Sequence, residues 1–424
     1  MAILDDKAVW LEKEVTEEEI RETIFHMKAN KAPGPYEFSI EFFKATWPIV
    51  GKEVVAVIQG FFISGLLLKE VNILNLVPKK INPSAMGDFR PISCCIVIYK
   101  CITKIISNRM LPLLGDLVSM NQSAFIPSRS IAENVLLAQE MVRNYHKGIG
   151  NPRCTFKIDL MKAYDSVNWE FMINCLQCFG FPKKFLCWIK ECITSPRFSV
   201  CLNGTLVGYF EGKKGLRQGD PSSPYLFVLV MEVFSRLMTM STGPDSGFKF
   251  HPKCLKLKLT HLCFSDDLLI FSKASLSSIN VIKAVLVEFE ELSGLKANPS
   301  KSSFYCSGIS KRVKHTLLNE LQMKEGYLPV RYHGVPLISS RLSSTDCRVL
   351  FDRITGRIDS WLSRNLSYAG RLQLLSIYSL QVYWTGIFIL LKKVVKSIEH
   401  KFNRFLWNGK DVKVAKAKLA WNDV

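Results

Sequence analysis

The spacing of apolar residues changes along this 424-residue chain and predicts three regions. Near the N-terminus, Thr16 followed by Glu19 forms a capping box that opens a helix through about Met27. In the centre, short apolar runs of strand length alternate with helical stretches. From about residue 345 to 407 the spacing is mostly helical. The pattern therefore predicts an α+β fold in which a mixed centre lies between two helical ends.

The individual elements follow from apolar periodicity and from turn residues at the ends of each run. Further helices are expected at residues 39–45, 49–63, 96–110, 131–146, 169–179, 183–192, 222–240 and 276–292. Strands are expected at residues 73–77, 155–160, 198–202, 206–211, 259–264, 268–272 and 302–306. Asn203-Gly204 predicts a hairpin turn, and residues 119–129 are expected to form a loop.

Carboxylates occupy the ends of two predicted strands. Asp159 follows an apolar strand, and Asp266 and Asp267 lie at the tip of a predicted hairpin between apolar arms. A desolvated carboxylate costs several kcal/mol unless a cation neutralises it. If the two strands are neighbours, their carboxylates can surround two Mg²⁺ ions, an arrangement that suits phosphoryl transfer. Acids in such places also occur as turn or cap residues, so the residues alone leave both interpretations open.

A loop bounded by glycine and proline opens the long apolar helix predicted at residues 222–240. It spans residues 215–224 (GLRQGDPSSP). Glycine allows close approach of a ligand to the backbone, and Arg217 and Gln218 supply donors for a base or a phosphate. The segment is equally consistent with a plain loop and an N-capped helix.

The chain is strongly basic, and its charge is unevenly distributed. It contains 56 Lys and Arg against 37 Asp and Glu, a formal net charge of +19 at pH 7. Residues 1–22 contain eight acids and three bases, whereas residues 392–418 contain nine bases and two acids. An excess of base predicts a polyanionic partner, with nucleic acid first and an acidic membrane surface second.

Other features argue against membrane and secreted classes. No uninterrupted apolar run approaches the roughly 18–20 residues of a membrane helix. Asp5 and Asp6 stand where a signal peptide carries bases. The thirteen cysteines are odd in number, and many lie in apolar segments, which indicates reduced thiols. We therefore expect an intracellular protein of the nucleus or the cytoplasm.

Four segments in order resemble the palm motifs of reverse transcriptases and, more narrowly, the polymerase domain of plant LINE-type non-LTR retrotransposons. They are residues 157–167 (KIDLMKAYDSV), 216–224 (LRQGDPSSP), 264–267 (FSDD) and 294–302 (GLKANPSKS). Supporting segments include residues 31–35 (KAPGP), 89–93 (FRPIS), 122–131 (QSAFIPSRSI) and 333–337 (HGVPL). The resemblance covers about residues 15–410. It implies a right-hand polymerase with fingers, a helical thumb and a palm whose antiparallel sheet carries catalytic aspartates.

This resemblance divides the chain into four parts. They are an N-terminal helical extension (1–30), fingers with part of the palm (31–152), a palm with the catalytic motifs (153–310) and a basic helical thumb or connection (311–424). The C-terminal bases, interleaved with Phe402, Phe405 and Trp407, are expected to grip a primer–template duplex through its phosphates.

The activity that the resemblance implies is RNA-directed DNA polymerisation. The 3′-hydroxyl of a DNA primer would attack the α-phosphate of a dNTP opposite an RNA template. Asp159, Asp266 and Asp267 match the catalytic, metal-binding carboxylates. Two Mg²⁺ ions, for which Mn²⁺ can substitute, would be bridged by Asp159 and Asp266. Lys301 matches a lysine proposed to protonate pyrophosphate, and otherwise is a solvated surface lysine.

Four residues match substrate-binding positions of the family. Tyr164 matches an aromatic gate against the 2′-hydroxyl of the nucleotide, or it packs beneath the palm. Arg90 matches a fingers arginine near the triphosphate, where a bidentate contact favours arginine, or it pairs with Asp88. Gln218 matches the residue near the templating base pair, and Arg217 is expected to bind substrate beside it.

Several residues depart from the family pattern. Tyr36 and Glu37 stand where Asp and Gly are usual, Ser128 where Gly is common and His333 where Leu is usual. None of these changes removes an expected metal ligand. They nevertheless favour an alternative, a decayed or co-opted reverse-transcriptase-like protein that binds nucleic acid without polymerising. A maturase-like splicing factor is a more distant possibility.

The expected partners are an RNA template, a DNA primer and dNTPs, with no membrane. Full elements of the family carry an endonuclease, and the chain shows no such segment before residue 15. An endonuclease activity, if needed, is therefore expected from another chain or from a missing domain.

Overall fold

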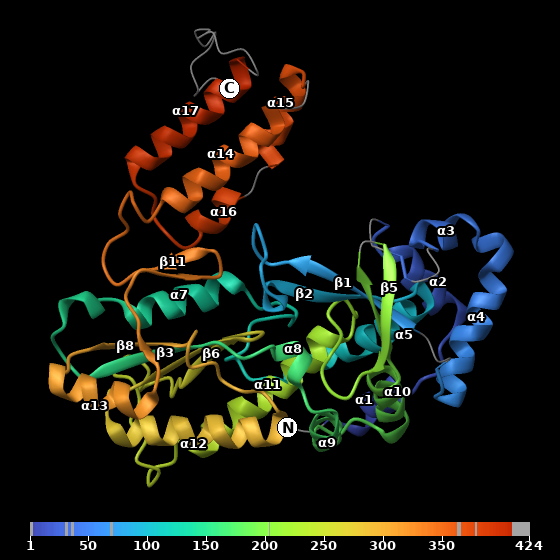
Figure 1. The fold of residues 1–424 in the computed structure, drawn as a ribbon, viewed down its shortest axis with the longest axis horizontal. Coiled ribbons are helices and arrows are strands. Elements are labelled where there is room, and N and C mark those ends of the chain that lie inside the picture. The colour runs from blue at the N-terminus through green and yellow to red at the C-terminus, as the bar shows by residue number, and fades with distance from the viewer. Residues whose placement is uncertain are drawn as a thin grey trace.

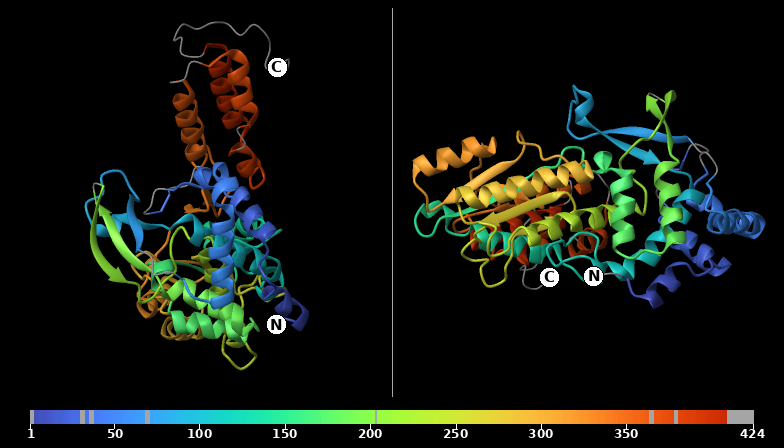
Figure 2. Two further views of the ribbon diagram at one scale, coloured as in Figure 1. Left: turned by 90° about the vertical axis from the view of Figure 1, so that its right-hand side faces the viewer. Right: turned by 90° about the horizontal axis from the view of Figure 1, so that it is seen from below.

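The computed structural model describes residues 3–29, 33–34, 38–67, 71–202, 204–362, 366–377 and 380–408. Tyr36 and Glu37, the predicted turn residue Asn203 and the basic residues 410–418 lie outside these ranges. The described part forms a broad body, from one side of which a column of C-terminal helices projects (Figures 1 and 2).

The N-terminal region contains α1 (Asp5–Leu11), α2 (Glu17–His26), α3 (Ile40–Ala45), α4 (Trp47–Ser64) and α5 (Val97–Met110). α1, α2 and α4 pack against α5, and α3 packs against α2 and α4. The predicted cap of α2 is present, since the Thr16 hydroxyl accepts the Glu19 backbone N–H at 3.2 Å. The Glu19 carboxylate pairs with Arg109 of α5 at 2.7 Å. Arg109, which is 4% exposed, also donates to the carbonyls of Leu11 and Glu14. One buried guanidinium thus holds α1 and α2 against α5.

A four-stranded sheet joins two hairpins that are far apart in the sequence. Its order is β2-β1-β4-β5. The strands are β1 (Val71–Pro78), β2 (Phe89–Cys94), β4 (Arg197–Leu202) and β5 (Thr205–Glu211). β1 and β4 are parallel, and the other pairs are antiparallel. β4 and β5 fall in the range predicted for the palm, yet they pair with strands from the range predicted for the fingers.

The second large sheet occupies the middle of the body. Its order is β6-β7-β3-β8-β9. The strands are β3 (Arg153–Ile158), β6 (His261–Phe264), β7 (Asp267–Ser272), β8 (Ser303–Ser307) and β9 (Lys324–Glu325). All pairs are antiparallel except the short parallel pair of β8 and β9. This confirms the antiparallel sheet expected of the palm. β9 lies beyond residue 310, where the palm is predicted to end.

Both faces of this sheet are buried because its side chains alternate between two hydrophobic clusters. Leu268 and Ile270 point to one cluster, which includes residues of α11 (Ser223–Met240) and α12 (Leu276–Ser293), beneath the sheet in Figure 1. Leu269 and Phe271 point to the other, with residues of α7 and the C-terminal helices. The helices of this region are α7 (Ile131–Val142), α8 (Ala163–Ser166), α9 (Trp169–Cys178), α10 (Lys183–Thr194), α11 (Ser223–Met240) and α12 (Leu276–Ser293). The packing holds the sheet rigidly from both sides.

The C-terminal region is mainly helical, as predicted. It contains α13 (Lys311–Leu321), the hairpin β10 (Val330–Tyr332) and β11 (Val335–Leu337), then α14 (Arg348–Leu362), α15 (Tyr368–Ile377), α16 (Leu380–Thr385) and α17 (Lys392–Asn408). α13 lies against α12, where Lys283 pairs with Glu320. α14 and α15 pack on α17, and the ring centroids of Trp361 and Phe405 are 5.7 Å apart. These last helices form the projecting column (Figure 1).

Two helices bear on the expectation that the chain has no apolar run long enough for a membrane helix. α4 and α11 are each 18 residues long and apolar enough to cross a membrane by length and composition. The buried share of their residues is 61% for α11 and 33% for α4. A buried core helix satisfies the same criteria, and α11 supplies much of the core beneath the central sheet. All thirteen cysteines are free thiols.

Replacing Arg109 with Met is expected to lower the free energy of unfolding by about 2–4 kcal/mol, because it leaves buried carbonyls and Glu19 without their partner. Urea unfolding followed by circular dichroism measures this. Arg143→Met is the control, since the Arg143–Glu140 pair is 67% and 50% exposed and surface pairs contribute less than about 1 kcal/mol. Equal losses in the two variants would contradict an anchoring role for Arg109.

Candidate active site

The strand register brings the predicted carboxylates to one end of the central sheet. Ile158, the last residue of β3, pairs with Leu268 of β7. Continuing this antiparallel register by one residue places Asp159 opposite Asp267, on the same face of the sheet. Asp266 precedes Asp267 at the β6–β7 turn. The structure therefore brings together Asp159, Asp266 and Asp267.

The turn that carries Asp266 is fixed by a segment predicted only as a loop. Ser265 has a φ of +57°, in the left-handed region that a residue with a side chain rarely occupies. Its backbone N–H donates to the Gln122 side-chain oxygen at 3.1 Å, and Gln122 is completely buried. Residues Asn121 and Ser123 exchange backbone hydrogen bonds with Cys263 of β6. Gln122 is thus a site residue that the sequence analysis missed, although it lies in the segment QSAFIPSRSI.

Two of the carboxylates are unfavourable in their charged form. The pKa of Asp266 is raised by desolvation and then by the charges of Asp267 and Asp159. The pKa of Asp267 is raised by desolvation and by Asp159, while Lys157 opposes the shift. Accumulated negative charge that Lys157 offsets only in part is the electrostatic environment in which a bound cation is most favourable.

His333 contacts this carboxylate cluster. Its Nδ1 lies 3.7 Å from a carboxylate oxygen of Asp267. Its ring packs against Phe264 and Tyr332, with centroid distances of 4.5 and 4.0 Å. Burial lowers the pKa of His333 to about 4, with a further contribution from Lys157. The ring is therefore neutral at pH 7 and acts as a packed, uncharged neighbour of Asp267.

Two of the residues that depart from the family pattern have left-handed backbone conformations. Ser128 has a φ of +64° and His333 a φ of +45°. A glycine adopts such a conformation without steric cost, which explains why Gly is common at the position of Ser128. The departures at Tyr36 and Glu37 lie outside the described residues.

Tyr164 lies beside the turn that carries Asp266. Its hydroxyl is 3.3 Å from the hydroxyl of Ser265. Its ring stacks on Phe227 of α11 at 4.7 Å, with 14° between the planes. Both interpretations of Tyr164 are therefore compatible with the structure, because the ring packs on a core helix while its hydroxyl end reaches the turn beside Asp266.

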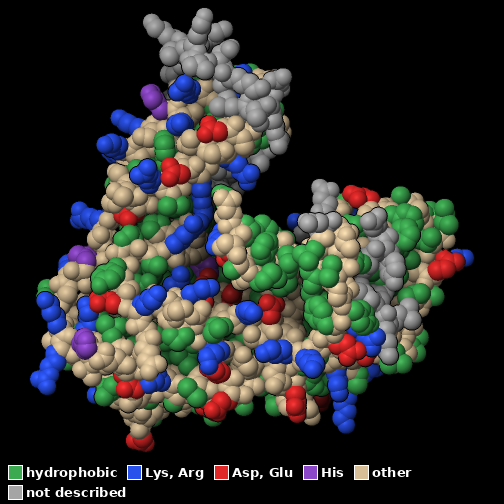
Figure 3. All heavy atoms as spheres, in the orientation of Figure 1, with side chains coloured by type: hydrophobic (Ala, Val, Ile, Leu, Met, Phe, Trp, Pro, Cys, Tyr) green, Lys and Arg blue, Asp and Glu red, His purple; other side chains and the backbone are tan. Residues whose placement is uncertain are grey.

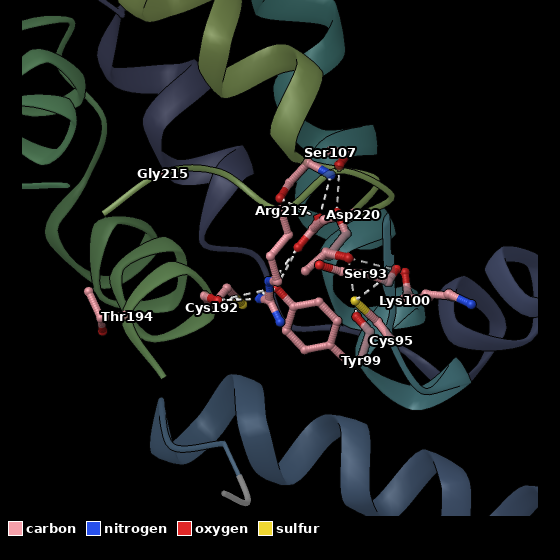
Figure 4. A network of polar contacts seen from close by, with 12 residues as sticks. Ser93, Cys95, Tyr99, Lys100, Ser107, Cys192, Thr194, Gly215, Arg217 and Asp220 are labelled. Carbon is pink, nitrogen blue, oxygen red and sulfur yellow. Dashed lines mark hydrogen bonds and ion pairs between the residues drawn. The ribbon is translucent and has the colours of Figure 1, made fainter. Parts of the chain in front are cut away.

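Gln218 and Arg217 diverge although they are neighbours in the sequence. The Gln218 amide donates to the Asp165 carboxylate at 3.2 Å, one residue from Tyr164. The Arg217 side chain points the other way and is 8% exposed. It donates to the Cys192 carbonyl and the Tyr99 hydroxyl, and its guanidinium lies 4.0 Å above the Tyr99 ring (Figure 4).

The buried Arg217 network is closed by a carboxylate. Asp220 lies 3.5 Å from the Arg217 guanidinium and accepts the Tyr99 hydroxyl at 2.6 Å. It also accepts the backbone N–H and the hydroxyl of Ser222 at the start of α11. These contacts engage the Arg217 guanidinium inside the protein, where it links α5, α10 and the loop before α11. The predicted substrate contact of Arg217 stays a prediction.

Arg90 and Lys301 lie at the surface. Arg90 is exposed on β2, and the alternative pairing with Asp88 is wrong, since Asp88 pairs with Lys80 at 2.9 Å. Hydrogen bonds from Lys80 and from backbone N–H groups lower the pKa of Asp88 to about 2. Lys301 is exposed, and the next residue, Ser302, accepts the backbone N–H of Asp159 at 3.1 Å. The structure thus places Lys301 beside the cluster and does not bring Arg90 into contact with it.

The carboxylates fit a divalent ion that is shared with a ligand. Within the residues that the structure describes, no three His, Cys, Asp or Glu side chains are grouped so as to hold a metal by themselves. Mg²⁺ is typically bound through one or two carboxylates, water and substrate phosphates. The oxygen-only donor set and the raised pKa values of Asp266 and Asp267 suit that mode of binding.

Comparison with known families identifies the chain. A family profile described as reverse transcriptase (RNA-dependent DNA polymerase) matches residues 77–337. The chain belongs to the reverse transcriptase family. That family generally uses divalent metal ions, in agreement with the carboxylate cluster, and the right-hand polymerase fold predicted from the motifs is the fold of the family.

Two curated relatives of this reverse transcriptase come from transposable elements of animals. The transposon TX1 149 kDa protein of Xenopus laevis is 25% identical over 423 residues, covering 94% of this chain and 30% of the relative. The retrotransposable element R2DM polyprotein of Drosophila melanogaster is 26% identical over 225 residues, covering 53% and 20%. The chain thus spans less than a third of either relative. These similarities assign the reverse transcriptase domain to the non-LTR retrotransposon kind, with relatives from animals.

Two further similarities are shorter or more distant. The uncharacterized mitochondrial protein AtMg01250 of Arabidopsis thaliana is 40% identical over 68 residues, covering 16% of this reverse transcriptase and 54% of the relative. A solved structure of telomerase from Candida albicans has 11% identity and a TM-score of 0.40, covering 87% of this chain and 63% of that one.

Asp266→Asn is expected to raise the melting temperature at pH 7 by about 1–3 °C, because it removes a charge from the repulsive cluster. The raised pKa means that the folded state binds this proton more tightly than the unfolded state. The wild-type penalty is therefore complete above the folded-state pKa and disappears as the pH falls toward the ordinary value of 3.8. Thermal unfolding in EDTA between pH 4 and 8 measures this.

The control for this experiment is Asp245→Asn at an exposed position. Its melting temperature should follow the wild type at every pH. A lower melting temperature of Asp266→Asn at pH 7 would contradict the repulsion.

Proposed function

We propose that this chain is an RNA-directed DNA polymerase that extends a DNA primer with dNTPs on an RNA template. The observation that carries the proposal is the register that sets Asp159 opposite Asp267 and next to Asp266. Within the family, carboxylates at this place match the catalytic motifs. The plant LINE-type assignment is part of the same proposal and rests on the order and the residues of the four motifs.

Three aspartates would hold the metal ions. Asp159 and Asp266 would be the principal ligands of two Mg²⁺ ions, and Asp267 would contribute less directly. When bound, the ions lower the pKa of the primer hydroxyl and stabilise the charge on the leaving pyrophosphate. The rigid turn held by Gln122 keeps the Asp266 carboxylate in place. Lys301, exposed beside Ser302, donates the proton to pyrophosphate.

The substrate-binding roles follow the positions of the side chains. The Tyr164 ring, fixed on Phe227, excludes the 2′-hydroxyl of a ribonucleotide. Gln218 lies near the templating base pair, and the exposed guanidinium of Arg90 takes the triphosphate. Arg217 acts by holding the loop that presents Gln218.

The C-terminal column would grip the primer–template duplex. Five bases lie on α17, namely Lys392, Lys393, Lys396, Lys401 and Arg404. Figure 3 shows lysine and arginine side chains on the column and on the surface that faces the recess between the column and the body. Contacts of this kind give affinity that is independent of sequence and falls with salt.

The wider setting of the activity is also a proposal. The relatives are much longer, so an endonuclease activity, if needed, would come from another chain or from a part beyond this sequence. The thirteen free cysteines are consistent with work in the nucleus or the cytoplasm.

Asp159→Asn and Asp266→Asn are each expected to reduce primer extension on poly(rA)/oligo(dT) by more than about 100-fold, with Mg²⁺ or Mn²⁺, because each removes a charged metal ligand. Incorporation of labelled dTTP measures this, with Asp245→Asn as the active control. Wild-type incorporation no higher than that of Asp266→Asn would overturn the polymerase proposal. With duplex binding intact, that result would support the alternative of a decayed protein that only binds nucleic acid.

Tyr164→Ala is expected to increase incorporation of rNTPs relative to dNTPs by roughly tenfold or more, since it removes the ring that excludes the 2′-hydroxyl. Tyr164→Phe keeps the ring and should keep the discrimination. Single-nucleotide incorporation with matched rNTP and dNTP measures the ratio. Unchanged discrimination in Tyr164→Ala would show that Tyr164 only packs against α11.

A further inference from the structure

We infer that a hollow beside the four-stranded sheet binds one unpaired base of the template strand, ahead of the base pair that is being formed. The inference rests on the proposed polymerase function. The hollow has a volume of about 300 Å³ and lies between the inner face of that sheet, α8–α9 and residues 212–218.

Aromatic side chains form one side of the hollow. Phe198 of β4 and Phe210 of β5 are paired across the strands, with ring centroids 5.7 Å apart. Trp169 faces them across Gly212, where an added Cβ would meet the Phe198 ring at 3.2 Å and the Trp169 ring at 3.4 Å. Phe210 is 45% exposed. Such open aromatic faces stack on nucleobases of any sequence.

Polar and cationic groups border the aromatic side. Asp165 and Gln218 offer an acceptor and an amide to the edge of a base. Lys213 and Lys214 are exposed at the rim, where they can neutralise the phosphates on either side of an inserted base. Aromatic faces, base-edge groups and lysines together match a single-stranded nucleic acid better than an uncharged small molecule.

The short helix α8 connects the hollow to the β6–β7 turn that carries Asp266. In α8, the Tyr164 hydroxyl approaches Ser265 at 3.3 Å, while the next residue, Asp165, accepts the Gln218 amide in the hollow at 3.2 Å. Gly215 holds this wall in place, because an added Cβ would lie 2.7 Å from the Asp165 carbonyl. A template strand that leaves the carboxylate cluster on the side of Gln218 therefore meets the hollow at once.

The nucleotide triphosphate is a less suitable occupant. Pro91 and Ser93 of β2 line the hollow, and side chains alternate along a strand. Arg90, the residue proposed to take the triphosphate, is thus on the opposite face of β2. The hollow is also lined by the carboxylates of Asp165 and Glu211, which would repel the three phosphates of a nucleotide, whereas an inserted base is uncharged and its amino group can donate to Asp165.

The test measures binding of a labelled hairpin duplex whose 5′ template overhang is 0, 1, 2 or 4 nucleotides long, by fluorescence anisotropy without dNTP. The wild-type affinity should rise in one step, roughly tenfold, at the overhang length that reaches the hollow. Phe210→Ala should abolish the step and leave binding of the blunt duplex unchanged. An abasic nucleotide at that overhang position should abolish it in the wild type.

Tyr209→Ala is the matched control, since Tyr209 adjoins Phe210 on β5 but contacts Arg197 and does not line the hollow. It should retain the step, and thermal unfolding should show both variants folded. A gradual rise with length that Phe210→Ala shares would indicate phosphate contacts alone and overturn the inference. A step that the abasic site leaves unchanged would also overturn it.

The same measurement in Asp266→Asn separates the two proposals, because binding needs no turnover. If the stepwise rise in affinity persists while wild-type primer extension fails, the polymerase proposal is overturned and the inference about the hollow is retained. If wild-type extension is normal and the affinity shows no step, the inference about the hollow is overturned and the polymerase proposal is retained.

Discussion

The repulsion among three carboxylates at one end of a buried sheet is the constraint on which the rest of the molecule depends. Desolvation and like charge disfavour the ionised forms of Asp266 and Asp267, so the cluster requires rigid support. The sheet receives that support from two hydrophobic clusters, one on each face. Gln122 adds it locally by holding Ser265 in a strained conformation. The two hydrophobic clusters thus offset the free energy of unfolding that the charge repulsion and the strained turn remove.

Local patterns predicted most of the elements and the position of the carboxylates. Two short apolar runs on either side of the Asp266-Asp267 turn were sufficient for the β6–β7 hairpin, because hairpins are determined by neighbouring residues. The Thr16 cap was likewise readable from four residues. That Asp159 lies beside the hairpin followed only from the family motifs, since a pairing across a hundred residues leaves no periodic signal.

What the sequence did not reveal depends on side-chain direction and on long-range pairing. β2 escaped prediction because Pro91 interrupts its apolar pattern. The motif LRQGDP does not show that the Arg217 side chain turns into the core while Gln218 stays at the surface. The Gln122 contact joins a loop to a turn more than a hundred residues later. Such interactions become visible only when the strands are assembled.

The parallel pairing of β1 with β4 has a consequence for synthesis on the ribosome. Val71 pairs with Arg197, so 197 − 71 = 126 residues separate the partners. At about 5–20 residues per second, β1 and β2 wait roughly 6–25 s for β4 to appear. During this time the inner edge of β1 is an unpaired strand, the kind of edge that invites aggregation. Production of this protein therefore depends on how that edge is protected while the chain is still growing.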